Sequence, residues 1–101
     1  ELEVWSSKTT QAIYLIGLAA VNLFKGSTTI ARKNLELVEL NRVELGYEKY
    51  VTLFYLLISI KVNYLAAQTD QISEEYAQLK ALVNETGFTQ FLTVTNNILK
   101  N

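Results

Sequence analysis

Apolar and polar positions follow helical spacing along most of this 101-residue chain. The clearest case is residues 28–45, where charged side chains occupy one side of a helical wheel. Apolar side chains occupy the other side. The charged set is Arg32, Lys33, Glu36, Glu39 and Glu44, and the apolar set is Ile30, Ala31, Leu35, Leu37, Val38 and Leu45. This pattern predicts an amphipathic helix over residues 28–45.

Further helices are predicted before and after this one, at residues 4–25, 47–68 and 71–85. The last of these has an apolar stripe with spacings of four, three and four, formed by Ile72, Tyr76, Leu79 and Val83. Thr69 or Asp70 is placed to cap it. The tail also fits a strand, because FLTVT alternates, but Phe88, Phe91, Leu92 and Thr95 fit a helix, which we expect here.

Turns are marked by glycine, at Gly26, Gly46 and Gly87. The chain has four Gly and no Pro, the residue that breaks helices most strongly. We therefore predict an all-α fold in a single domain, residues 1–101. It is a small bundle, or long helical hairpins, of about four to five helices with short Gly-marked turns.

Residues 50–67 are apolar around nearly the whole helix, with one charge at Lys61. Such a helix must be covered by protein or by lipid. Its 18 residues approach the roughly 20 needed to span a bilayer, but Lys61 and Asn63 lie well inside it and oppose insertion. We expect protein to cover it. Because the chain is short, we expect neighbouring copies to supply part of that cover.

A seam of small polar side chains runs along this helix. Thr52, Ser59 and Asn63 return to nearly the same helical angle, and buried polar groups require partners. The proposed counterpart is Asn34 and Asn41, which are seven residues apart in the preceding helix. The alternative is that both Asn lie at the rim of the apolar side of that helix, and the sequence does not separate the two.

Composition argues against an enzyme. The chain has no His, no Cys and one Asp, and that residue, Asp70, is placed at a helix start. Glu36 and Glu39 share a face but lack the Glu-x-x-His motifs of di-iron bundles. We predict no catalytic, cofactor or metal site.

The net charge is −1, and the cations Lys8, Lys25, Arg32 and Lys33 are too few to predict sequence-specific nucleic-acid binding. The first residues lack a signal-peptide pattern, so we expect none in this sequence.

Aromatic residues make up 11% of the chain, and Tyr suits subunit interfaces. The candidate interface is Tyr47, Tyr50, Phe54, Tyr55, Tyr64, Phe88 and Phe91.

We predict a non-enzymatic structural subunit that binds copies of itself, as a small virion coat protein or an extracellular filament or pilus protein does. One alternative is a membrane-embedded helical hairpin in contact with lipid. The other is a soluble adaptor that takes a partner helix in an apolar groove.

Overall fold

The computed structural model describes residues 7–100 of the chain, and every α-helix and turn below lies in that range. The helices are α1 (Lys8–Phe24), α2 (Thr28–Glu36), α3 (Glu48–Leu65), α4 (Thr69–Thr86) and α5 (Gln90–Lys100), with a short 3₁₀ turn, η2 (Leu40–Arg42). Residues 7–100 contain no β-strand, so the predicted all-α class is confirmed. The part of the first predicted helix at residues 4–6 lies outside the described residues.

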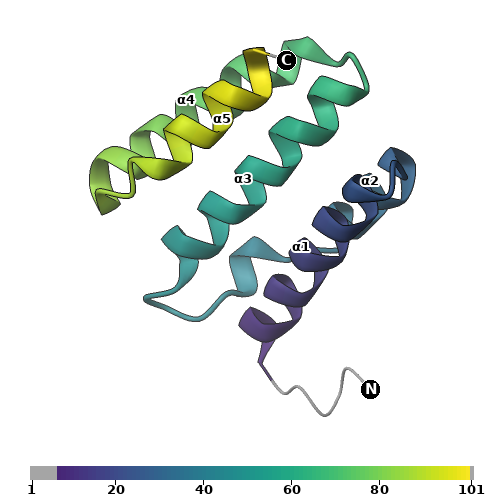
Figure 1. Ribbon diagram of the computed structural model, residues 1–101. Helices are drawn as coiled ribbons and strands as arrows, with labels where there is room; N and C mark the ends of the chain where they lie inside the picture. The colour runs from purple at the N-terminus through teal and green to yellow at the C-terminus, as the bar shows by residue number, and fades with distance from the viewer. Residues whose placement is uncertain (1–6, 101) are drawn as a thin grey trace.

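Helix α1 begins with a side-chain cap and ends at glycine. The Ser7 hydroxyl accepts hydrogen bonds from the backbone N–H groups of Thr9 and Thr10, at 3.0 and 3.3 Å. Gly26 adopts a φ of 84°, a left-handed conformation that costs glycine little. The chain then turns directly into α2, which packs antiparallel on α1 as a hairpin (Figure 1).

The second predicted helix is half its expected length, which corrects the boundary at Leu45. Helix α2 stops at Glu36, and the next N–H groups, of Leu37 and Val38, bond three residues back rather than four. The chain then leaves the helical path, and Val38, Leu40 and Val43 pack against the core beside α1 and α2. Partial burial of these three side chains explains the break, because a straight helix continued past Glu36 would carry them away from this core.

Helix α3 lies between two helical hairpins, α1–α2 and α4–α5 (Figure 1). One core cluster joins α3 to the first hairpin, through Ala12, Ile16, Ala19, Ala31, Leu35, Val51 and Val62. The other joins α3 to the second hairpin, through Leu53, Leu56, Ile60, Ile72, Leu79, Val83 and Phe91. A single copy therefore covers two opposite sides of α3, which is more of this helix than the sequence led us to expect.

Helices α4 and α5 form the second hairpin. Helix α4 starts at Thr69, and Gln68 is its N-cap residue without a side-chain cap, so neither Thr69 nor Asp70 caps it as predicted. Its end is marked by Gly87, whose φ is 80° and whose N–H donates to the Val83 carbonyl at 2.7 Å. The tail is helical, as predicted, because Phe91 and Leu92 pack onto the core of α3 and α4.

Candidate functional site

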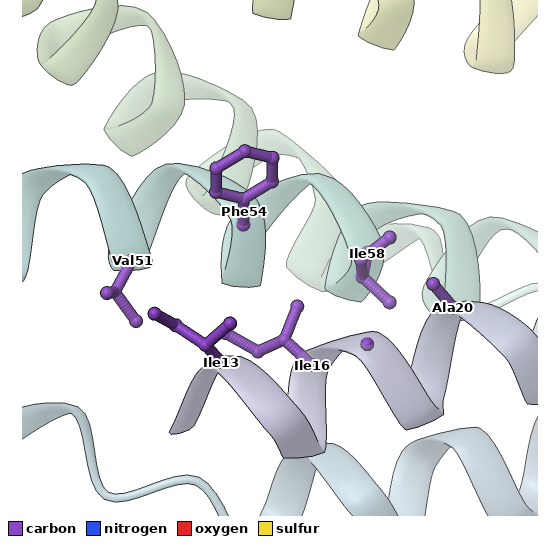
Figure 2. Close-up of a pocket in the computed structure, with 7 residues that line it drawn as sticks. Ile13, Ile16, Ala20, Val51, Phe54 and Ile58 are labelled. Carbon is purple, nitrogen blue, oxygen red and sulfur yellow. The ribbon is translucent and has the colours of Figure 1, made fainter. Parts of the chain in front are cut away.

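One side of the molecule carries an apolar depression between α1 and α3. Its lining side chains come from two helices, Ile13, Ile16, Gly17 and Ala20 from α1 and Val51, Phe54 and Ile58 from α3. Figure 2 shows the α1 residues facing Phe54 and Ile58 across it. No polar side chain takes part in this lining. The depression therefore suits an apolar ligand surface rather than a polar small molecule.

The depression continues toward α5. A neighbouring hollow is lined by residues of three helices, Ala20, Leu23, Phe24, Leu57, Ile58, Lys61, Val94 and Ile98. Lys61 is the one charged residue of this lining. The two hollows share Ala20 and Ile58, so they form one surface across α1, α3 and α5. We call this surface the apolar face.

Several large apolar side chains of this face are exposed to solvent. Phe24 is 94% exposed, Ile13 56% and Phe54 52%. Burial of apolar surface is the main favourable term in protein association, at roughly 25 cal/mol per Å². Large exposed apolar patches on soluble proteins are typical of interaction sites, so the apolar face is the candidate site of this chain.

Helix α1 has apolar residues on both its inner and outer sides. The inner side is buried or half-buried and carries Thr9, Ala12, Ile16, Ala19 and Leu23. The outer side is exposed, and its residues follow heptad spacing of four, three, four and three: Thr10, Tyr14, Gly17, Val21 and Phe24. We call this second set the outer stripe. No residue between Lys8 and Lys25 is charged, so the outer stripe lacks the charged surface usual for an exposed helix side.

The aromatic residues predicted for an interface divide into two groups. Tyr47, Tyr50 and Phe54 are exposed, at 56%, 44% and 52%. Tyr55, Tyr64, Phe88 and Phe91 are half-buried or buried in the cores instead.

Ring contacts join these two groups. The centroids of Tyr50 and Phe88 are 5.5 Å apart, and Phe54 meets Phe91 edge to face at 5.1 Å. Phe88 and Phe91 thus pack against the exposed rings of Tyr50 and Phe54 and connect them to the core.

The polar seam of α3 meets α4. The Ser59 hydroxyl donates to the Glu75 carboxylate, and the Asn63 Nδ2 donates to Glu75 Oε1 at 2.7 Å. Asn63 is 1% exposed and Ser59 9% exposed, so both depend on these partners. Thr52, the third residue of the seam, is half-buried on the same helix.

Asn63 also joins α3 to α2. Its Oδ1 accepts a hydrogen bond from Arg32 Nη2 at 3.1 Å, so the amide lies between a cation and a carboxylate. The amide oxygen faces the guanidinium and the amide nitrogen faces Glu75, an arrangement that fixes the orientation of the group. Charge-assisted bonds at both ends make this contact stronger than a neutral pair.

The predicted counterpart of the seam is wrong. Asn34 accepts a hydrogen bond from Asn22 of α1 at 2.8 Å, and Asn41 lies exposed on η2. Because α2 ends at Glu36, the two Asn are not on one helix and heptad spacing does not apply to them. The partners of the seam are Arg32, Glu75 and Gln71, whose Oε1 accepts from Asn63 Nδ2 at 3.4 Å. Glu75 follows Ile72 by three and precedes Leu79 by four, so it lies on the apolar stripe of α4, a signal present in the sequence.

Tyr55 is half-buried on α3, the helix that carries the seam. Desolvation raises the pKa of Tyr55, and the carboxylates of Glu75 and Glu36 raise it further.

The described residues contain no cluster of three His, Cys, Asp or Glu side chains able to hold a metal ion. None of the helices within residues 7–100 combines the length and the hydropathy that a membrane crossing requires.

Comparison of the chain with protein families, curated proteins and solved structures found no match.

Proposed function

We propose that this chain is a non-enzymatic helical subunit that assembles with copies of itself through the apolar face, as a small coat or filament protein does. The observation that supports this proposal is the exposure of large apolar side chains over α1, α3 and α5. A surface of this kind is stable in water when another apolar surface covers it.

The same geometry also supports a second function, that of an adaptor. The depression between α1 and α3 is a groove of the kind that receives one side of an amphipathic helix. In that case the chain alone is monomeric, and its size increases when a partner helix binds.

The size of the purified chain tests the first function. We expect light scattering at micromolar concentration to give a mass well above the 11.5 kDa of one copy, both without detergent and with mild detergent. A monomer without detergent contradicts self-assembly and favours the adaptor. A protein that stays dispersed only in detergent indicates lipid contact instead.

A substitution on the apolar face makes the test specific. Phe54→Glu places a charge in the depression and is expected to reduce assembly by at least tenfold, since a buried unpaired carboxylate costs more than about 1.4 kcal/mol. Gln78→Glu adds the same charge at an exposed position of α4 and is the matched control. Equal assembly of both variants contradicts a role for the apolar face.

A further inference from the structure

We propose that the outer stripe of α1 packs against the outer stripe of a second copy, with the two α1 helices antiparallel about a two-fold axis at Gly17. This inference rests on the proposed function and names the interface between two copies. It depends on three properties of α1: the residues that pair about Gly17, charges near the helix ends, and exposed apolar side chains.

Pairing two α1 helices about Gly17 brings the outer stripe of each copy against α1 of the other. With Gly17 opposite Gly17 of the second copy, Thr10 lies opposite Phe24. Tyr14 and Val21 of the stripe lie opposite Ala20 and Ile13, which adjoin the stripe and line the depression. Phe24 and Tyr14 thus meet smaller residues. In a two-fold interface each of these pairs occurs twice, with the roles of the copies exchanged.

Gly17 permits the helices to approach closely at the axis. A Cβ atom built at this position meets no other atom within 4 Å, so nothing within one copy requires glycine there. Glycine inside a helix costs about 0.5–1 kcal/mol relative to alanine. Close approach of a second backbone accounts for a residue that the isolated chain does not need.

Charges at the two ends of α1 also match in this register. Lys25 follows the last helical residue and lies opposite Thr9 of the second copy. Glu44 lies beside Thr9, because its backbone N–H donates to Thr9 Oγ1 at 2.7 Å, and its carboxylate accepts from Ser7 at 3.0 Å. Each Lys25 therefore approaches Glu44 of the other copy, once at each end of the contact.

Large exposed side chains supply apolar area for the contact. Ile13, Tyr14, Val21 and Phe24 are 40–94% exposed, and Phe54 lies across the depression from Ile13. A standard interface buries about 800 Å² per partner, and three of these five side chains are large aromatic groups of the kind that form the centre of such a contact. A second copy presents the same five side chains, so both partners of the pair contribute them.

Disulfide trapping tests the axis, because the chain has no Cys of its own. Gly17→Cys places the two thiols at the axis, within the short Cβ–Cβ separation that a disulfide needs. We expect mild oxidation to convert most of this variant to a covalent dimer on a non-reducing gel. Lys80→Cys on the exposed side of α4 is the control and is expected to remain largely uncrosslinked.

Two more positions fix the direction of the helices. Thr10 and Phe24 each lie seven residues from Gly17, so identical residues of the two copies are about 21 Å apart. Neither Thr10→Cys nor Phe24→Cys is expected to crosslink alone, whereas an equimolar mixture of the two is expected to form a mixed dimer. Both side chains are exposed, so this test does not depend on how Gly17→Cys folds.

Charge reversal tests the end contacts. Lys25→Glu and Glu44→Lys are each expected to weaken dimerisation roughly threefold to tenfold, and the double variant is expected to restore it. Failure of the double variant to restore binding overturns the register.

The outcomes separate this inference from the proposed function. If the wild-type chain assembles but Gly17→Cys crosslinks no better than Lys80→Cys, and the mixed pair does not crosslink, the two-fold contact is wrong while self-assembly stands. Crosslinking of Thr10→Cys with itself indicates parallel helices and also overturns the inference. If the wild-type chain is monomeric throughout, both proposals fail.

Discussion

At the scale of single residues, Ala67, in the turn that joins α3 to α4, has a strained backbone conformation. Its φ of 59° is left-handed, although the residue has a Cβ atom, and its N–H bonds to the Tyr64 carbonyl at 3.2 Å. The corresponding positions after α1 and α4 are Gly26 and Gly87, with φ of 84° and 80°. A left-handed conformation costs an ordinary L-residue about 1–2 kcal/mol.

This contrast predicts opposite effects for two reciprocal substitutions. Ala67→Gly relieves the strain. The greater freedom of glycine in the unfolded chain offsets part of this gain, so the substitution is expected to raise the free energy of unfolding by about 0.5–1 kcal/mol. Gly87→Ala introduces the strain and is expected to lower it by about 1 kcal/mol. Urea unfolding at one protein concentration measures both, and a change of the same sign for both argues against the two turns as described.

The phenol of Tyr55 gives a second prediction, for alkaline pH. Burial raises its pKa in the folded chain, whereas the unfolded chain ionises it near pH 10. A raised folded pKa contributes stability that is fully present below the unfolded pKa. That stability is lost as pH rises through the folded pKa.

Tyr55→Phe removes this dependence. We expect the variant to lose less free energy of unfolding between about pH 8 and pH 11 than the wild-type chain does, since the other five Tyr residues are common to both. Urea unfolding at the two pH values measures the difference. An identical loss in the two proteins is inconsistent with a raised pKa at Tyr55.

At the scale of helices, the Asn63 amide connects three of them: α3, which carries it, α2 through Arg32, and α4 through Glu75. Removing the amide takes one hydrogen bond from Arg32 and one from Glu75. Water cannot easily replace these bonds, because Asn63 is only 1% exposed. Loss of a buried hydrogen-bond partner costs about 1–3 kcal/mol, and more when charged groups are involved.

The same substitution at two Asn residues tests this role. Asn63→Ala is expected to lower the free energy of unfolding by about 2–3 kcal/mol. Asn41→Ala, on the exposed turn η2, is expected to change it by less than about 0.5 kcal/mol. Equal effects in thermal or urea unfolding contradict the role given to the Asn63 amide.

The sequence predicts the helices well but not all their ends. Glycine at positions 26, 46 and 87 and the periodic apolar residues give the number and order of helices. The end of α2 is not predictable in this way, because residues 37–45 keep helical periodicity. The break is favoured only by the packing of Val38, Leu40 and Val43 against the core formed by α1, α2 and α3. The start of α4 at Thr69 is likewise set by the turn at Ala67.

The candidate site is less predictable than the fold. Sequence spacing placed Ser59 and Asn63 on one side of α3, but their partners depend on which helices lie beside it. The outer stripe is not predictable from the sequence for a physical reason: an uncharged helix with apolar residues on both sides has the composition of a core helix. Only the exposure of Phe24 and Val21 shows that one side is uncovered.

At the scale of the whole molecule, the extents of 40 × 32 × 20 Å describe a flat shape. The flatness follows from the two hairpins, which pack on opposite sides of α3 rather than closing over it (Figure 1). The part of α3 left open between them forms the floor of the apolar face. The same arrangement that buries α3 on two sides thus leaves Phe54, on its third side, exposed.

The position of α3 between two separate cores also bears on how the chain opens. We expect each hairpin to be able to detach from α3 while the other core stays intact, and α3 itself to be released only when both have detached. In amide hydrogen exchange we therefore expect the slowest protons at Leu56, Ile60 and Val62, at the free energy of global unfolding. Amides of α2 and α5 are expected to exchange through smaller openings, at lower free energy and with weaker dependence on urea. Native-state exchange resolved by NMR would then show two independently opening units that share one central helix.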